Sequence, residues 1–286
     1  MRLLILFSVL AVLVQCTRSK SDEPFTDYDL SKVPYEINSP SKTMALHYDL
    51  EEISGLSYYD EKTLLCVQDE SGKVYFIDNE SGEIKKELKF GKGGDYEGVE
   101  ILNKRIYVVA SNGKLTSFIP DSAVEARTVN TSLSIKNDVE GLGLLQGKLT
   151  LYCKADGALP DNKAKGKVAY FFDSDLNELV PNPAFSFKVK DLQKFIKHRE
   201  HFNTLQDFDP SGVAEHPMTN DIYIVTADRA LLVLSPDFEI KELVKLNRLI
   251  YKQPEGICFS PNGTLYISNE GDGARAKLVR LDYLRL

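Results

Sequence analysis

The feature that most constrains this sequence is a short motif that recurs about every 43 residues. It consists of a polar or acidic residue, a glycine and an aliphatic residue. The five copies are Ser54-Gly55-Leu56, Glu97-Gly98-Val99, Glu140-Gly141-Leu142, Ser211-Gly212-Val213 and Glu255-Gly256-Ile257. Successive copies are 43, 43, 71 and 44 residues apart. A period in the low forties, built from short strands, is typical of the blades of a β-propeller.

The content of each unit supports an all-β fold. One strand follows the glycine, a strongly apolar second strand comes next, and a third and a more amphipathic fourth follow after polar turns. The last unit ends after its third strand, whereas the segment 43–50, before the first motif, is an unassigned strand. Pairing the two would complete the last blade and remove exposed sheet edges. The sequence therefore predicts five four-stranded blades.

The long third step leaves one alternative, a sixth blade. Its extra residues are better explained by a loop rich in Gly, Pro and Lys at 155–167 and by the segment 188–203. In that segment apolar residues recur at helical spacing, which predicts one amphipathic helix packed on the side or top of the propeller. We therefore expect a five-bladed β-propeller with one inserted helix over residues 43–286.

The amino-terminal residues resemble an export signal. Arg2 is followed by an apolar segment, 3–14, that is shorter than the roughly 20 residues a membrane-spanning helix needs. Leu13-Val14-Gln15-Cys16 resembles a lipobox, so we predict a signal peptide over 1–16 and lipidation of Cys16, with ordinary cleavage nearby as the alternative. The polar segment 17–42 is expected to be a flexible linker. These features predict an exported protein that is anchored by lipid to an inner or outer membrane, with its soluble domain in the periplasm or at the cell surface.

Charge and cysteine content exclude some classes of function. The chain has 42 acidic and 35 basic residues, giving a net charge of −7, which argues against a nucleic-acid partner. Cys66, Cys153 and Cys258 each lie in an apolar, strand-like segment and are far apart in sequence. We expect buried free thiols, with a Cys66–Cys258 disulfide as the alternative.

The same topology predicts where functional side chains gather. In a propeller the first strand of each blade lines the central channel, and the turns before it and after the second strand lie on one face. Acidic residues from these turns could ligate a metal ion: Asp69, Glu97, Glu140, Asp228, Glu255 and Glu270. Residues that could contact a ligand there are Asn112, Lys154, Asp156, Asp209 and Asn269.

Crowded carboxylates raise one another's pKa unless a cation offsets their charge. Calcium, which takes six to eight oxygen ligands, is the cation we expect at the channel. The alternative is that each polar residue only satisfies backbone groups at its turn. Lys154, Arg229 and Arg275 could hold a small anionic ligand at this face, although pairing with the carboxylates is the preferred interpretation.

Catalytic motifs are weak. The chain has no G-x-S-x-G sequence, and the glycine-rich segment 91–95 lacks the features of a P-loop. His198 and His201 are best interpreted as helix surface. The sequence therefore favours a binding protein that presents a surface to an envelope protein, a glycan or a small ligand, with a metal-dependent hydrolase as the enzyme alternative.

In combination, several motifs resemble the SdiA-regulated (YjiK-like) propeller family. They are Glu52-Ile53-Ser54-Gly55-Leu56, Asp69-Glu70-Ser71-Gly72, Asp95-Tyr96-Glu97-Gly98, Pro254-Glu255-Gly256-Ile257 and Leu265-Tyr266-Ile267-Ser268-Asn269-Glu270. The resemblance covers roughly residues 45–286 and implies an envelope-associated propeller with a calcium site, without an established reaction.

Pro254-Glu255-Gly256, together with the segment 260–266, is more distantly similar to NHL and gluconolactonase-like propellers. The resemblance to the lactonases implies that the residues corresponding to their metal ligands are Glu97, Glu140, Glu255 and Asp228. However, the asparagine that usually precedes one of the glycines is absent from all five motifs here. Calcium-dependent propeller phytases are a third similar group, but they have more basic residues facing the metal than this chain offers.

Overall fold

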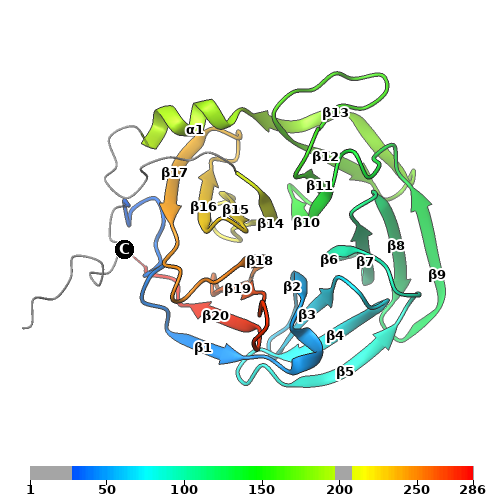
Figure 1. Cartoon of the computed structure of the whole chain (residues 1–286), viewed down its shortest axis with the longest axis horizontal. Coiled ribbons are helices and arrows are strands. Elements are labelled where there is room, and N and C mark those ends of the chain that lie inside the picture. Colours follow the sequence, from blue (N-terminus) through cyan, green and yellow to red (C-terminus); the bar gives the residue numbers. More distant parts are fainter. Residues whose placement is uncertain (1–27, 197–207, 286) are drawn as a thin grey trace, which may run out of the picture.

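The computed structural model describes residues 28–196 and 208–285, and it shows five four-stranded antiparallel sheets arranged around one axis (Figure 1). The prediction of a five-bladed β-propeller is therefore confirmed, and the long third step holds no sixth blade among the described residues.

Each blade follows the chain outward from the axis. Blade I comprises β2 (Ile53–Asp60), β3 (Thr63–Gln68), β4 (Lys73–Asp78) and β5 (Ile84–Lys89). Blade II comprises β6 (Tyr96–Leu102), β7 (Arg105–Ala110), β8 (Lys114–Ile119) and β9 (Ser122–Asn130). Blade III comprises β10 (Val139–Leu145), β11 (Lys148–Cys153), β12 (Lys167–Asp173) and β13 (Glu178–Phe187). Blade IV comprises β14 (Pro210–Glu215), β15 (Ile222–Thr226), β16 (Ala230–Leu234) and β17 (Ile240–Lys245). Blade V comprises β18 (Pro254–Phe259), β19 (Leu265–Asn269), β20 (Lys277–Leu281) and β1 (Lys42–Ala45).

The two ends of the chain close the ring in blade V. Strand β1 pairs antiparallel with β20, so that Thr43 lies opposite Val279 (Figure 1). This is the predicted closure, but the strand is shorter than the expected segment 43–50. It ends at Ala45 and is followed by a 3₁₀ helix, η1 (Tyr48–Leu50). Pairing β1 with the last strand of the chain leaves no open edge on β20.

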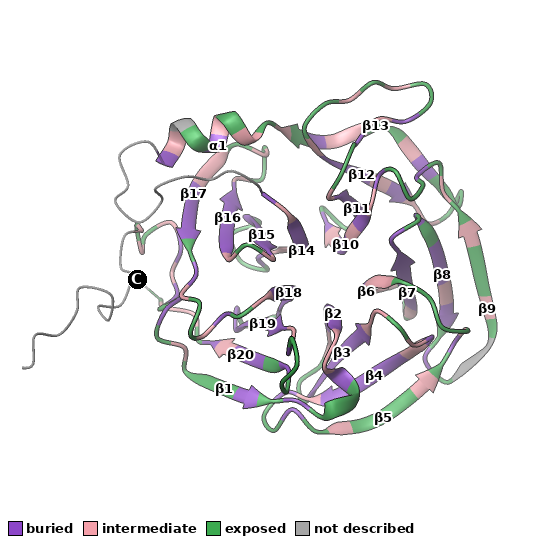
Figure 2. Ribbon diagram, in the orientation of Figure 1, coloured by how far each residue is buried: buried purple, intermediate pink, exposed green. Residues whose placement is uncertain are grey.

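The core lies between neighbouring blades. Apolar side chains on facing sheets form five clusters, one of which joins Leu56 of β2 to Tyr266 of β19. All six residues of β18 are buried, whereas most of β5 at the rim is exposed (Figure 2). The inner strands are therefore fixed by packing on both faces, which gives the channel rigid walls.

The segment 28–41, expected to be part of a linker, belongs instead to the folded domain. Val33, Tyr35 and Ile37 are fully buried against blades IV and V. The Tyr35 hydroxyl donates to the Gly263 carbonyl (2.6 Å), and the Tyr251 hydroxyl donates to the Ile37 carbonyl (2.6 Å). The alternation of apolar residues at 33, 35 and 37 is the signal for this contact, and it is masked by the polar composition around it.

The inserted helix is also present. Helix α1 (Val189–Ile196) lies beside β17 on the rim of blade IV, with Leu192 and Ile196 buried in the cluster there (Figure 1). The remainder of the predicted helix, including His198 and His201, lies outside the described residues, as does Cys16. Within 28–196 and 208–285, no helix has the length and apolar character needed to cross a membrane.

Candidate functional site

The recurring motif forms a β-bulge at the start of each inner strand. In β6 the pairing with β7 steps from Tyr96 to Gly98, which leaves Glu97 unpaired. In β10 it steps from Val139 to Gly141, which leaves Glu140 unpaired, and β2, β14 and β18 have register shifts at the same place. A bulge bends the strand and redirects the side chain of the extra residue. In β6 and β10 the acidic residue of the motif is therefore the extra residue of the bulge, which has no partner on the second strand.

The glycine of the motif allows neighbouring inner strands to approach closely. A Cβ atom on Gly98 would lie 2.7 Å from the backbone nitrogen of Leu142, and one on Gly212 would lie 2.5 Å from the carbonyl oxygen of Glu255. Gly141 is less restricted, since its nearest neighbour would be 3.4 Å away. Close approach of the backbones brings the bulge residues of different blades together near the axis.

Backbone hydrogen bonds hold the end of each second strand against the turn that precedes the first strand. The Asp69 N–H donates to the Glu52 carbonyl (3.3 Å), and the Glu270 N–H donates to that of Gln253 (2.9 Å). Corresponding bonds occur in blades II, III and IV. This pattern explains why residues spaced 15 positions apart, such as Glu255 and Glu270, lie on the same face.

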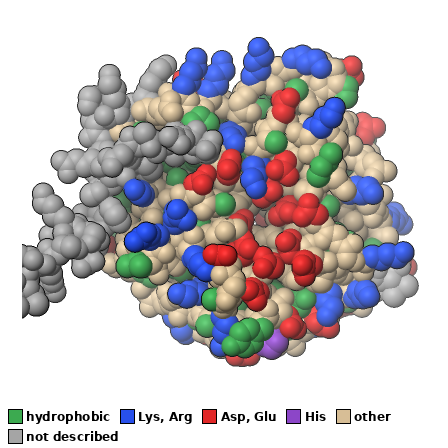
Figure 3. Space-filling model, viewed as in Figure 1, with side chains coloured by type: hydrophobic (Ala, Val, Ile, Leu, Met, Phe, Trp, Pro, Cys, Tyr) green, Lys and Arg blue, Asp and Glu red, His purple; other side chains and the backbone are tan. Residues whose placement is uncertain are grey.

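Glu97, Glu140 and Glu255 gather at the channel opening on this face. Acidic side chains surround the centre of the molecule in Figure 3. Burial, followed by the charges of Glu140 and Asp95, raises the pKa of Glu97 to about 10. Burial and the neighbouring Glu140 raise the pKa of Glu255, only 8% exposed, to about 8, although its hydrogen bond from Gln253 opposes the shift. Glu97 and Glu255 therefore retain protons at neutral pH, chiefly because burial disfavours their charged forms and also because neighbouring carboxylates repel them.

A second group of carboxyls continues the acidic surface from blade V to blade I. Burial, and then the hydrogen bond and charge of Glu52, raise the pKa of Glu270 to about 8. Burial and the charge of Glu52 also raise the pKa of Asp69. The Gln253 side-chain amide connects the two groups, since it donates to Glu255 (3.0 Å) and to Glu270. We call Asp69, Glu97, Glu140, Glu255 and Glu270 together the acidic mouth.

Two buried oxygen atoms at this face have no hydrogen-bond partner among the residues that the structure describes. They are Oδ1 of Asp69 and Oδ1 of Asn269, and the Asn269 side chain is almost completely buried, with 1% of the residue exposed. An unsatisfied buried acceptor costs about 1–3 kcal/mol. Each therefore favours a donor or a cation that would approach it.

Lys154 is paired with the acidic mouth. Its ammonium nitrogen lies 3.2 Å from Oε1 of Glu140. Burial alone would lower the pKa of Lys154, but the hydrogen bond and charge of Glu140, together with the charges of Asp138 and Glu255, outweigh burial and raise it. The pairing preferred from the sequence is therefore present for Lys154. Arg229 and Arg275 instead donate to backbone carbonyls, of Lys252 and of Leu46 and Ala45 respectively.

Other residues expected at the site are exposed, and two of them hydrogen-bond within their own turns. Asn112 is exposed and its Oδ1 accepts the Lys114 N–H (3.1 Å), while exposed Asp156 accepts the Ala158 N–H (3.0 Å) in the same way. Both are local turn contacts. Asp228 is exposed in the turn after β15.

Asp209 pairs with a lysine that the sequence did not indicate. Pro210 follows it at the start of blade IV and has no N–H to donate to the preceding blade. The Lys167 ammonium replaces the missing N–H as the donor to the Lys154 carbonyl (2.7 Å), and it also donates to Asp209 Oδ1 (3.1 Å). Gln253 was also missed, although it occupies the position equivalent to Glu52, two residues before the motif acid, and could have been found by aligning the blades.

The arrangement is rich in oxygen atoms, but it is not a preformed metal cage. Among the residues that the structure describes, no three His, Cys, Asp or Glu side chains are grouped in a way that could hold a metal ion as they stand. Instead, Glu97 and Glu255 keep their protons, Gln253 donates a hydrogen bond to Glu255, and Lys154 pairs with Glu140. Such a group can exchange protons or attract a cation.

Comparison with known proteins identifies the fold alone. No known family's sequence profile matches the chain, and no curated protein matches it. Among solved structures, a glutaminyl cyclase from Myxococcus xanthus is similar over 85% of this chain and 95% of its own, with a TM-score of 0.59 and 14% identity. A luciferin-regenerating enzyme is similar over 86% of this chain and 96% of its own, with a TM-score of 0.51 and 13% identity. At these identities the likeness extends to the β-propeller fold and not to the chemistry.

Proposed function

We propose that the protein is a binding propeller whose acidic mouth takes up a divalent cation, with calcium as the best match, and presents that face to a ligand or partner in the cell envelope. The observation that carries the proposal is the convergence of five carboxyl groups, from four blades, at one end of the channel. Burial and mutual repulsion raise the pKa of each of them.

The donor chemistry fits a hard cation. Carboxylate and amide oxygens are the ligands that calcium prefers, and it accepts six to eight of them in flexible geometry. The unpartnered oxygens of Asp69 and Asn269 add acceptors that at present bind nothing among the described residues. Since the carboxyls do not stand in a ready-made cage, we expect binding to draw them together and to release protons. That requirement favours a moderate affinity.

The location in the envelope follows from the sequence. The segment 1–16 and its Cys16 supply the export signal and the lipid anchor of the proposal, and stable anchoring needs more than one acyl chain. We further propose that the chain is a divergent SdiA-regulated (YjiK-like) propeller. Supporting this, the motif residues that carry the resemblance lie at the β-bulges and at the ends of the second strands, where they form the acidic mouth.

Thermal unfolding tests the cation proposal. The chain from residue 17 onward, which keeps every described residue, would be melted in EDTA and then with calcium or magnesium in excess. A cation at 100 times its Kd stabilises by about 2.7 kcal/mol. For a domain of this size that corresponds to a rise in Tm of about 5–10 °C. Elemental analysis would give the stoichiometry.

Matched variants locate the site. Glu97→Gln and Glu255→Gln keep the size and shape of the side chains but remove the ionisable groups, so both should lose the calcium-dependent rise. Glu178→Gln, an exposed residue on the outer strand β13, should keep it. If calcium causes no rise in the unaltered chain, or if the rise survives in both channel variants, the cation proposal fails.

The same proteins test the enzyme alternative. Turnover of simple lactones or of p-nitrophenyl phosphate, present with calcium and lost in Glu255→Gln, would make the protein a metal-dependent hydrolase. Calcium binding without turnover supports the binding function. For the anchor, Cys16→Ser in the full-length chain should move the protein from the membrane fraction to the soluble one, and an unchanged distribution would contradict lipidation.

A further inference from the structure

A cavity of about 370 Å³ lies on the face opposite the acidic mouth, where blade V meets blade I. Strand β2 starts at the acidic mouth and carries Tyr58 near its far end, and the turn 260–264 joins the far ends of β18 and β19. The cavity is bordered by Tyr58, Asn79, Glu80, Asn262, Tyr266 and Arg280, which we call the closure pocket. Its volume falls in the usual range for small-molecule sites, about 300–1,000 Å³.

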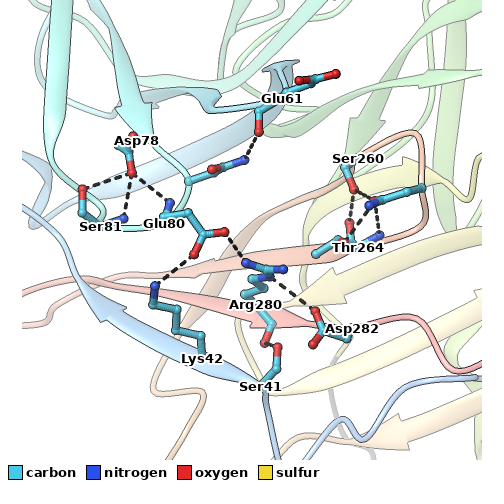
Figure 4. A network of polar contacts seen from close by, with 12 residues as sticks. Ser41, Lys42, Glu61, Asp78, Glu80, Ser81, Ser260, Thr264, Arg280 and Asp282 are labelled. Atoms are coloured by element: carbon cyan, nitrogen blue, oxygen red, sulfur yellow. Dashed lines mark hydrogen bonds and ion pairs between the residues drawn. The ribbon is translucent and has the colours of Figure 1, made fainter.

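The charged groups of the closure pocket are already balanced by one another. Glu80 accepts from Lys42 of β1 (3.0 Å) and from Arg280 of β20, so one carboxylate joins blade I to both outer strands of blade V (Figure 4). Arg280 Nε also lies 3.4 Å from Asp282. Two cations thus face two carboxylates, and the nearby Glu61 carboxylate makes the surroundings slightly negative. An anionic ligand would meet no unmatched positive charge here.

The polar rim is held in a fixed arrangement. Oδ1 of Asn262 accepts from the Thr264 hydroxyl (3.1 Å) and backbone N–H (3.2 Å), and Ser260 donates to the same amide oxygen. On the other side, the Asn79 amide donates to the Glu61 carbonyl (3.0 Å). The rim therefore needs little ordering before it contacts a ligand, which reduces the entropic cost of binding.

Several polar groups in the closure pocket remain available. Neither the Tyr58 nor the Tyr266 hydroxyl makes a hydrogen bond to a described residue, and the Arg280 guanidinium borders the pocket, although its Nε is buried beside Asp282 (3.4 Å). Tyrosine combines an apolar ring with a polar tip. One half-buried tyrosine ring, two tyrosine hydroxyls, a guanidinium and a fixed amide rim suit a ligand that has many hydroxyl groups, an apolar C–H face and no charge.

We infer that the closure pocket binds a neutral saccharide unit, separately from the acidic mouth. The half-buried Tyr58 ring would contact the C–H face of the sugar, while the Tyr58 and Tyr266 hydroxyls and Arg280 would hydrogen-bond its hydroxyl groups. The excess negative charge at Glu61 sets the preference for a neutral sugar over a uronate.

Saturation-transfer difference NMR and tyrosine fluorescence test this inference, since the chain contains no tryptophan to obscure the tyrosine signal. The chain from residue 17 onward would be titrated with N-acetyl-D-glucosamine, D-glucose and D-glucuronate. We expect saturable, millimolar binding of at least one neutral sugar and weaker binding of D-glucuronate. The result should be the same in EDTA and in calcium, which separates this site from the acidic mouth.

Variants identify the pocket. Tyr58→Ala should weaken binding of the neutral sugar about tenfold or more, because an aromatic contact and a hydroxyl are both lost. Tyr58→Phe should restore part of the loss by keeping the ring. Tyr48→Ala, an exposed tyrosine in η1 at the other face, should bind as the unaltered chain does. Absence of binding by both neutral sugars, equal binding of the uronate, or undiminished binding by Tyr58→Ala would each overturn the inference.

Discussion

His216 gives the sharpest test of how burial controls a titratable group in this fold. The side chain is fully buried beside the amino-terminal segment. Its Nδ1 accepts the N–H groups of Met218 (3.2 Å) and Thr219 (3.1 Å), and its Nε2 lies 2.9 Å from the Tyr35 hydroxyl. Since Nδ1 accepts two hydrogen bonds, Nε2 carries the proton and donates to Tyr35, which in turn donates to Gly263. A second proton, on Nδ1, would face two N–H groups.

Burial, assisted by the charge of Lys241 and opposed by that of Asp221, lowers the pKa of His216 from 6.5 to about 4. The unfolded chain therefore binds a proton at His216 below about pH 6.5, while the folded chain stays neutral there down to about pH 4. The contribution of His216 to the free energy of unfolding is complete above about pH 6.5 and decreases as the pH falls towards 4. A shift of this size corresponds to about 3 kcal/mol.

His216→Asn isolates this contribution, because its amide oxygen can still accept from Met218 and Thr219 but does not titrate. Urea unfolding at about pH 7.5 should show the variant less stable by about 2 kcal/mol or more, owing to the lost bond to Tyr35 and the lost ring contacts. At about pH 4.5 the difference in free energy of unfolding between the unaltered chain and the variant should be smaller by about 2 kcal/mol, because only the unaltered chain loses the contribution of His216. A gap that is the same at both pH values would refute the assignment of His216 as a neutral, buried group.

Three further predictions follow from packing and pairing. Gly98→Ala, which would place Cβ 2.7 Å from Leu142, should lower stability in thermal unfolding by about 1–3 kcal/mol, whereas Gly141→Ala, with its nearest neighbour at 3.4 Å, should change it little. Burial raises the pKa of Cys153 to about 12 and that of Cys66 still further, so neither thiol should react with Ellman's reagent until the chain unfolds; rapid labelling of the folded chain would contradict this. Lys167→Met leaves Asp209 and the Lys154 carbonyl without this partner and should cost about 1–3 kcal/mol in urea unfolding, against less than about 1 kcal/mol for Lys73→Met, which removes a more exposed pair with Glu87.

The architecture could be predicted from the sequence because each blade repeats the same local structure, a β-bulge and a glycine at the start of its inner strand. The glycine after Glu97 is required by the close approach of Leu142, and the same constraint recurs at Gly212 with Glu255. A constraint that repeats with the period of the fold is visible in one sequence. The repeat also indicated the acidic mouth, since the residue before the glycine, such as Glu97 or Glu140, is the unpaired residue of the bulge.

Features that occur once could not be found in this way. The packing of Tyr35 against His216, the substitution of Lys167 for a missing N–H at Pro210, and the Glu80 bridge in the closure pocket each depend on contacts between distant segments. They arise where the repeat is broken, at the ring closure and at the long insertion in blade III. No signal at the period of the blades marks such positions, so only the three-dimensional arrangement shows these contacts.

The propeller also explains how so many unfavourable carboxyl groups can coexist at one surface. Desolvation and repulsion at the acidic mouth oppose folding, since Glu97 and Glu255 must keep protons that the unfolded chain would release at neutral pH. The apolar clusters between blades lie outside this region and are not interrupted by it, as the fully buried strands β15 and β16 show. Stability and the acidic mouth are therefore supplied by different parts of each blade. A cation that binds at the mouth would recover part of the free energy that the carboxyls cost, which is why the thermal response to calcium is the measurement that distinguishes a binding site from a merely acidic surface.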